Sequence, residues 1–250
     1  MKEDLKRQIV ELTSVHKGLT YVVGHDDAET IVSGALPFEA SADGLETITE
    51  SFEIELIIPH DFPETLPRVK ETGGRIGTDY EHLHPGGTLC LAVPVEQRRV
   101  FFEQPTLLGF VNRLVIPYLY GYCFWKKYGR HPFDEAAHGH EGILRHYVDT
   151  LGLRDDLAAL AVICFLFEHG YRGHHDCPCG SGLRVRACHG RALRVLHEHH
   201  TPQTVLDDFW AIFNICFARF QNGQLSFPQP LQIQIARILR RFPDEYEPPR

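Results

Sequence analysis

Four metal-ligating side chains lie close together in the last third of the sequence. Cys177, Cys179, Cys188 and His189 form the pattern C-x-C-x8-C-H. Zinc prefers four thiolate or imidazole ligands in a tetrahedron, and two close pairs joined by a tight loop can supply them. This spacing favours a metal over a set of reduced structural cysteines. Because four protein ligands leave no open position, the pattern predicts a structural Zn²⁺ site.

A second stretch with possible chemistry is HLHPGGTLCLAVP, in which Cys90 follows the turn His84-Pro85. A cysteine in this position can pack in a core, bind a metal or carry out covalent chemistry. An isolated cysteine inside an apolar run is most often a buried packing residue. The elements around Cys90 must therefore decide between these alternatives.

The composition predicts an ordinary globular protein of one large domain or two modest ones. Its 250 residues are 43% apolar and 23% charged, which is enough for a sizeable core. The net charge of −8 disfavours binding to nucleic acid or an anionic membrane. The charged N-terminus does not resemble a signal peptide, and the longest apolar runs are too short to span a bilayer. We therefore expect a cytoplasmic protein.

Hydrophobic periodicity predicts a helix and then an antiparallel meander in the first half. Apolar residues recur at helical spacing over residues 2–14. The stretches LTYVV and ETIVSGALPFEA are typical of a hairpin. Strict alternation in TITESFEIELIIP indicates a half-buried strand, and RVKETGG completes a four-stranded sheet.

The segments after the sheet are expected to be a rigid turn, a long ordered loop and a buried helix. The prolines of HDFPETLP fix the backbone and remove donors, so this turn leaves the sheet. The loop ends at LCLAV. The apolar stretch FEQPTLLGFVNRLVIPYLYGY predicts a helix that begins at Pro105 and ends near Pro117.

The run HPFDEAAHGHEG is rich in acidic and histidine side chains. It has neither a helical frame nor a second group of ligands, so we interpret it as a solvated loop or the N-terminus of a helix rather than a metal site. A short helix ending at Gly152 is expected to follow. The following part, residues 153–250, is expected to be helical around a compact Cys-rich loop. Cys164 and Cys216 lie in its apolar helical runs and are predicted to be core residues.

Together these patterns predict an α+β fold with two domains, residues 1–152 and 153–250. The zinc loop lies in the second domain. Its sequence, CPCGSGLRVRACHG, resembles the SEC-C zinc motif. That resemblance implies a small module for interaction with another protein.

The first domain resembles the ubiquitin-conjugating enzymes, specifically their divergent bacterial relatives, over about residues 1–150. DFPETLPRV stands where the family has a tyrosine-proline turn, a proline and a strand. HPGGTLCL stands where it has His-Pro-Asn followed by the catalytic Cys-Leu. FEQPTLLGFVNRLV matches the helix that follows the active site. The resemblance implies a ubiquitin-conjugating-like fold with Cys90 as the catalytic residue.

This resemblance also implies roles for the neighbours of Cys90. The cysteine would receive a protein C-terminus as a thioester and pass it to an amine. The His84 ring would hold the loop in place, His82 would give polar support, and an acidic residue among 79–81 could orient the incoming amine. Gly86 replaces the family asparagine, so backbone amides or His82 would have to stabilise the oxyanion.

The implied partners are a ThiF-like activating enzyme, a ubiquitin-like protein or other conjugation target, such as a cyclic-nucleotide synthase, and a JAB-type peptidase, in an antiphage defence operon. Two alternatives stay open at this point. The chain could be a non-catalytic module that binds ubiquitin-like proteins. It could also be a zinc-mediated adaptor, for which the negative net charge makes nucleic acid a poor partner.

Overall fold

The computed structural model describes residues 3–23, 29–133 and 137–242, and the chain forms two compact units, residues 1–135 and 136–250. The first unit combines a sheet with helices and the second is helical, so the α+β prediction is confirmed. The division falls earlier than the 152/153 boundary expected from the sequence. The reason is that α5 (Gly139–Leu151) packs against α6 (Asp156–His169) and α8 (Pro202–Gln221) of the second unit.

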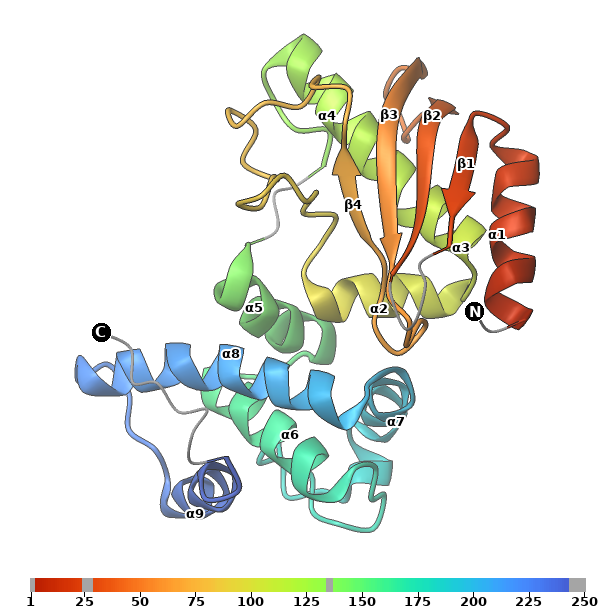
Figure 1. Cartoon of the computed structure of the whole chain (residues 1–250). Coiled ribbons are helices and arrows are strands. Elements are labelled where there is room, and N and C mark those ends of the chain that lie inside the picture. The colour runs from red at the N-terminus through yellow and green to blue at the C-terminus, as the bar shows by residue number, and fades with distance from the viewer. Residues whose placement is uncertain (1–2, 24–28, 134–136, 243–250) are drawn as a thin grey trace. The chain divides into compact units, whose positions relative to one another are not determined.

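The sheet of the first unit is a four-stranded antiparallel meander in the order β1-β2-β3-β4 (Figure 1). The two long central strands pair along their whole length, from Thr30 opposite Ile58 to Ala40 opposite Ile48. The alternation seen in the sequence of β3 places Phe52 and Ile54 in the core and Glu53 in solvent. The predicted meander is therefore confirmed. Its strands are β1 (Leu19–Val22), β2 (Thr30–Ala40), β3 (Ile48–Ile58) and β4 (Arg68–Glu71).

Helices cover one face and one edge of this sheet (Figure 1). Helix α1 (Glu3–Val15) buries its apolar stripe beside β1, as its periodicity predicts. The segments α3 (Leu107–Phe110), η1 (Val111–Val115) and α4 (Ile116–Tyr128) follow one another without a break, and α4 packs on β2 and β3. These segments supply most of the helical side of the core.

This helix differs from its predicted limits. It begins at Leu107 rather than Pro105, because the Thr106 side chain accepts a hydrogen bond from the Gly109 amide and caps it. It does not end near Pro117. The π-helical stretch η1 changes the bonding pattern just before this proline, which then lies in the first turn of α4, where its missing N–H is tolerated.

The continuous segment Leu107–Tyr128 is long and apolar enough to cross a membrane by length and composition. This corrects the expectation that every apolar run is too short. However, 67% of its most apolar window is buried inside the protein. Such burial is typical of a helix in a protein core.

Helix α2 (Pro94–Glu103) occupies a stretch for which we predicted no helix. It has little amphipathic character, and the one local signal is Pro94 at its first position. Asp134 and Glu135, in the run interpreted as a solvated loop, lie outside the described residues.

The second unit contains a tightly packed group of helices. Helix α6 is buried on nearly all sides and packs on α8, α5 and α9 (Gln229–Leu239). Cys164 and Cys216 are fully buried, so their prediction as core residues is confirmed. The Cys-rich loop contains the short 3-10 helix η2 (Val185–Ala187) and leads into α7 (Gly190–His199), which the sequence analysis did not predict.

Candidate functional sites

Cys90 lies on one arm of a tight hairpin closed by the His-Pro-Gly-Gly turn. The Cys90 amide donates to the His82 carbonyl at 2.9 Å, and the His84 amide donates to the Thr88 carbonyl at 2.8 Å. These two bonds flank the antiparallel bridge between Leu83 and Leu89. The turn uses φ values of 93° at Gly86 and 81° at Gly87, a region that favours glycine.

The hairpin has an apolar side and a side that carries Cys90. Leu89 is buried in the core and Leu83 packs against it. His82 and Cys90 form the next opposed pair, and side chains alternate along a strand. His82 and Cys90 therefore project from the same side, opposite to that of the leucines. Both are half-buried.

The hairpin is joined to the sheet and to the helix that follows it. The Leu89 amide donates to the Val69 carbonyl of β4 at 2.8 Å. From α4, the Tyr118 hydroxyl donates to the His82 carbonyl at 2.9 Å. The carbonyl opposite Cys90 thus has a partner from a distant part of the chain, which the sequence analysis did not find.

The thiol of Cys90 is not activated by its surroundings. Burial raises its pKa above the ordinary value of a cysteine. Burial also raises the pKa of Tyr118 beside it. The group is therefore mostly a neutral thiol near pH 7, unlike the electropositive sites that hold a thiolate.

His84 contributes to the hairpin through its backbone, and the role of its ring that the resemblance implies stays a prediction. Its side chain is exposed, and within the described chain its ring makes no hydrogen bond. The backbone of His84 orders the loop instead, because its carbonyl also accepts from the Gly87 amide at 3.0 Å. The Gly87 and Cys90 amides are thus engaged, whereas the Gly86 amide makes no backbone hydrogen bond within the described chain.

The second site brings all four predicted metal ligands together. The ligand atoms of Cys177, Cys179, Cys188 and His189 all lie within 4.8 Å of one another. The His189 Nδ1 atom is 3.3 Å from the Cys177 sulfur and 3.2 Å from the Cys188 sulfur. Three thiols and an imidazole at this spacing form a closed set that can hold one metal ion.

The ring of His189 is oriented from outside the cluster. Its Nε2 atom lies 2.9 Å from the Leu151 carbonyl, to which it can only donate. The Nδ1 lone pair then faces the three sulfurs. This is the usual outer contact of a metal-bound histidine, and it fixes the tautomer that ligation needs.

The loop between the four candidate ligands turns tightly beneath them. The Cys177 amide donates to the Leu183 carbonyl at 2.7 Å, and Gly180 and Gly182 adopt φ values of 80° and 77°. The Ser181 hydroxyl lies 3.3 Å from the Cys188 sulfur. His174 and His175 lie near these ligands in the sequence and could also bind a metal, but they are not part of the cluster.

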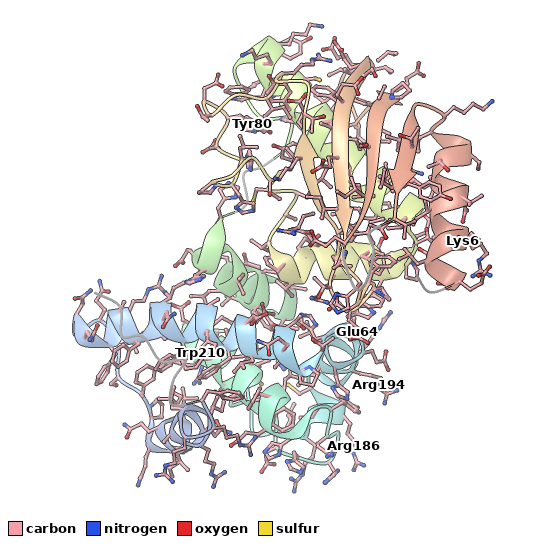
Figure 2. The ribbon with its side chains drawn as sticks, viewed as in Figure 1. Lys6, Glu64, Tyr80, Arg186, Arg194 and Trp210 are labelled. Atoms are coloured by element: carbon pink, nitrogen blue, oxygen red, sulfur yellow. The ribbon has the colours of Figure 1, made fainter. Side chains whose placement is uncertain are left out.

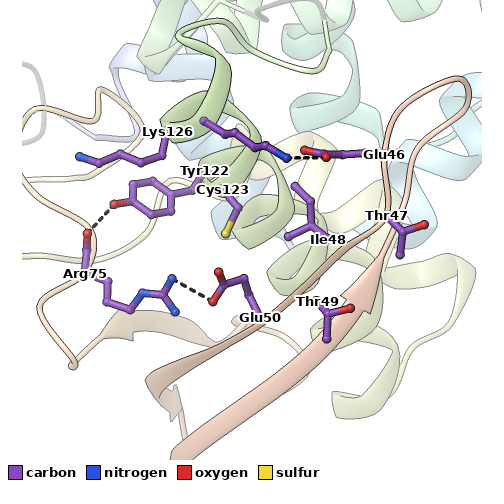
Figure 3. Close-up of a pocket in the computed structure, with 10 residues that line it drawn as sticks. Glu46, Thr47, Ile48, Thr49, Glu50, Arg75, Tyr122, Cys123 and Lys126 are labelled. Carbon is purple, nitrogen blue, oxygen red and sulfur yellow. Dashed lines mark hydrogen bonds and ion pairs between the residues drawn. The ribbon is translucent and has the colours of Figure 1, made fainter.

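A cavity of about 560 Å³ lies elsewhere in the first unit, between β3 and α4 (Figure 3). Its charged side chains are already paired: Arg75 with Glu50 at 3.0 Å, and Lys127 with Glu46 at 2.6 Å. Burial raises the pKa of Cys123 in its wall to about 11. These four charged side chains are therefore already neutralised by one another, and the Cys123 thiol is not activated for reaction with a ligand.

No family model matches this chain, and no curated protein matches its sequence. The interpretation of both sites thus depends on their residues and geometry.

Proposed function

We propose that this protein is an acyl-transfer enzyme of the ubiquitin-conjugating type, with Cys90 as its nucleophile. The observation that carries the proposal is the placement of Cys90. It lies on a His-Pro-Gly-Gly hairpin bonded to the last strand of a four-stranded meander, before the helices that cover the sheet. This order of elements matches the family that the sequence motifs resemble, and supports a ubiquitin-conjugating-like fold for residues 1–135.

The chemistry suits an unactivated cysteine. In the first step the Cys90 sulfur attacks a thioester on an activating enzyme. A new C–S bond forms, the old one breaks, and the departing thiolate takes up the proton. In the second step an amine attacks the acyl carbon, a C–N bond forms and the C–S bond breaks. Cys90 leaves as a thiolate, which takes up the proton that the amine nitrogen loses. Because the acyl group arrives already activated, the raised pKa of Cys90 is compatible with both steps.

The Gly86 amide is the backbone donor that best fits stabilisation of the oxyanion in both steps. Gly86 stands at the position of the missing asparagine, on the exposed turn, and its backbone has no Cβ to shield it. His82 supports this hairpin through its carbonyl, and His84 supports it through its backbone.

We further propose that the Cys–His cluster holds a structural Zn²⁺ ion and that the second unit docks a partner protein. The ligand set is that of known structural zinc sites, with no open position for chemistry. The partners that fit this function are a ThiF-like activating enzyme, a ubiquitin-like protein or a target such as a cyclic-nucleotide synthase, and a JAB-type peptidase. An antiphage defence operon follows from the same resemblance, and we propose a cytoplasmic location as well.

A second candidate is a non-catalytic module that binds ubiquitin-like proteins. The raised pKa of Cys90 and the missing asparagine favour it. In this case substitution of Cys90 would leave binding intact, and no acyl group would be transferred.

An adduct trap separates the two candidates. The Cys90→Ser variant is expressed in the native host beside its neighbouring genes, purified, and its intact mass is measured. Serine would hold the acyl group as a slowly hydrolysed ester. We expect a discrete mass increase that hydroxide removes, absent in Cys90→Ala.

Cys123→Ser serves as the matched control, because Cys123 is another half-buried thiol of the same unit. It should carry no ester. Absence of the Cys90→Ser adduct while the activating enzyme is active would overturn the enzyme proposal and favour the binding module.

A further inference from the structure

A second cluster of metal-ligating side chains lies in the first unit, next to the Cys90 hairpin. The ligand atoms of Glu81, His82 and His131 are all within 4.8 Å of one another. The His131 Nε2 atom lies 3.4 Å from the Glu81 carboxylate, and the two imidazole rings are 5.1 Å apart between centroids. Glu81 and His82 lie at the start of the hairpin, whereas His131 follows α4, so only the folded chain brings them together.

Aromatic side chains hold the two imidazoles in place. Tyr80, which is labelled in Figure 2, is buried and packs against both of them. Its ring centroid is 5.1 Å from that of His82 and 6.0 Å from that of His131. Trp125 of α4 stacks on His131 at 6.3 Å, with 28° between the planes. The rings thus lie against a packed wall, which reduces the entropy lost when they bind an ion.

We propose that Glu81, His82 and His131 bind a divalent transition-metal ion such as Zn²⁺. Two imidazoles and one carboxylate are a common ligand set for zinc and other first-row metals. Three protein ligands leave at least one coordination position for water or substrate. This site is therefore of the open kind, in contrast to the closed Cys–His cluster of the second unit.

The proposed metal site lies close to the Cys90 thiol. His82 is opposite Cys90 in the hairpin, and opposed residues of an antiparallel pair have Cβ atoms about 4.5–5.5 Å apart. A metal on His82 thus lies in the neighbourhood of the thiol. The Cys90 sulfur is not a member of the ligand group, so the open position remains available to another molecule. Metal binding itself does not depend on the proposed acyl transfer.

The same geometry also fits an ion pair of His131 with Glu81 and no metal, and the test must separate these cases. The purified full-length protein is equilibrated in a zinc buffer at nanomolar free Zn²⁺, and bound zinc per chain is measured by mass spectrometry. We expect about two ions for the native chain: one in the closed Cys–His site and one here.

Substitutions assign each ion to its site. Glu81→Gln and His131→Gln should each retain about one ion. Loss of a residue that only hydrogen-bonds a metal ligand lowers metal affinity about 10–100-fold, and loss of a ligand itself should lower it further. Cys177→Ser should lose the other ion. His84→Gln is the matched control, since His84 is an exposed histidine of the same hairpin outside the cluster, and it should retain both.

A local signal reports on the first unit alone. The chain has two tryptophans, Trp125 and Trp210. In a Trp210→Phe background, Co²⁺ should quench Trp125 fluorescence with saturation at one ion, and His131→Gln should abolish this while circular dichroism stays unchanged. Absence of saturable quenching would overturn the proposal. So would an equal number of bound zinc ions per chain in the native protein, Glu81→Gln and His131→Gln.

Discussion

The backbone amide of Cys90 donates a hydrogen bond to the carbonyl of His82, with 2.9 Å between nitrogen and oxygen. The same oxygen accepts the hydroxyl of Tyr118 from α4, also at 2.9 Å. The position of the thiol is therefore set jointly by a local hairpin and by a helix that follows later in the chain. A change in the hairpin or in Tyr118 should therefore alter the position and accessibility of the Cys90 thiol.

Tyr118→Phe should loosen the hairpin without emptying the core. It removes one hydrogen bond and keeps the ring, so we expect a loss of about 0.5–1.5 kcal/mol in unfolding free energy by urea denaturation. Alkylation of Cys90 under native conditions should become faster, as measured by peptide mass spectrometry. Tyr120→Phe is the control, since its hydroxyl bonds to the Glu46 carbonyl instead. An equal effect of both variants on Cys90 would contradict this link.

The reactivity of Cys90 should rise at a higher pH than that of a free cysteine. Burial raises its pKa above the ordinary value of about 8.5, so the thiolate is scarce at pH 7. Iodoacetamide labelling at Cys90 should therefore be slower than in an unfolded peptide and increase through the alkaline range. A midpoint below that of the peptide would show an activated thiol.

The same pKa has a consequence for stability. The fold favours the neutral thiol, so its contribution is fully present below the pKa of the unfolded chain and is lost as pH rises through the folded value. The Cys90→Ala variant should lack this alkaline component in a comparison of urea midpoints across pH. An unchanged profile in the variant would assign the loss to other groups.

Removal of the proposed zinc should disorder the Cys-rich loop and leave the sheet intact. Apparent zinc-binding free energies are about 10–16 kcal/mol in zinc-finger peptides, so the ion is expected to stabilise this loop strongly. After chelation or Cys188→Ser, hydrogen exchange should accelerate across residues 171–200 but not in β2 and β3. His174→Ala should behave like the native chain, because His174 is exposed and outside the cluster. Unchanged protection of the loop would refute a structural metal.

Two glycine substitutions test the close contact at the edge of the sheet. Gly34 in β2 has a φ of 132°, and a Cβ there would lie 2.2 Å from the Gly18 carbonyl oxygen. Gly44 also has a positive φ, but nothing lies within 4 Å of its Cβ position. Gly44→Ala should cost about 1–2 kcal/mol, and Gly34→Ala clearly more. Equal melting temperatures of the two variants would argue against the close contact between Gly18 and Gly34.

Local sequence determined several features of this protein. The alternation of Phe52, Glu53 and Ile54 was enough to predict a half-buried strand, because neighbours on a strand point to opposite faces. The cluster of metal-ligating side chains was also predictable, since Cys177 to His189 lie within one short loop whose geometry depends on nearby residues. The glycines beneath it supply the turns that this loop needs.

Only the tertiary structure decided the remaining features. Tyr118 meets His82, and His131 meets Glu81, across long separations that no local pattern encodes. Helix α2 lacks a clear apolar stripe, and the helix through Pro117 continues because of the π-helical turn before it. Local spacing can predict which ligands a short loop offers. Contacts between distant segments depend on how the whole core packs, and that packing placed Tyr118 and His131 beside the Cys90 hairpin.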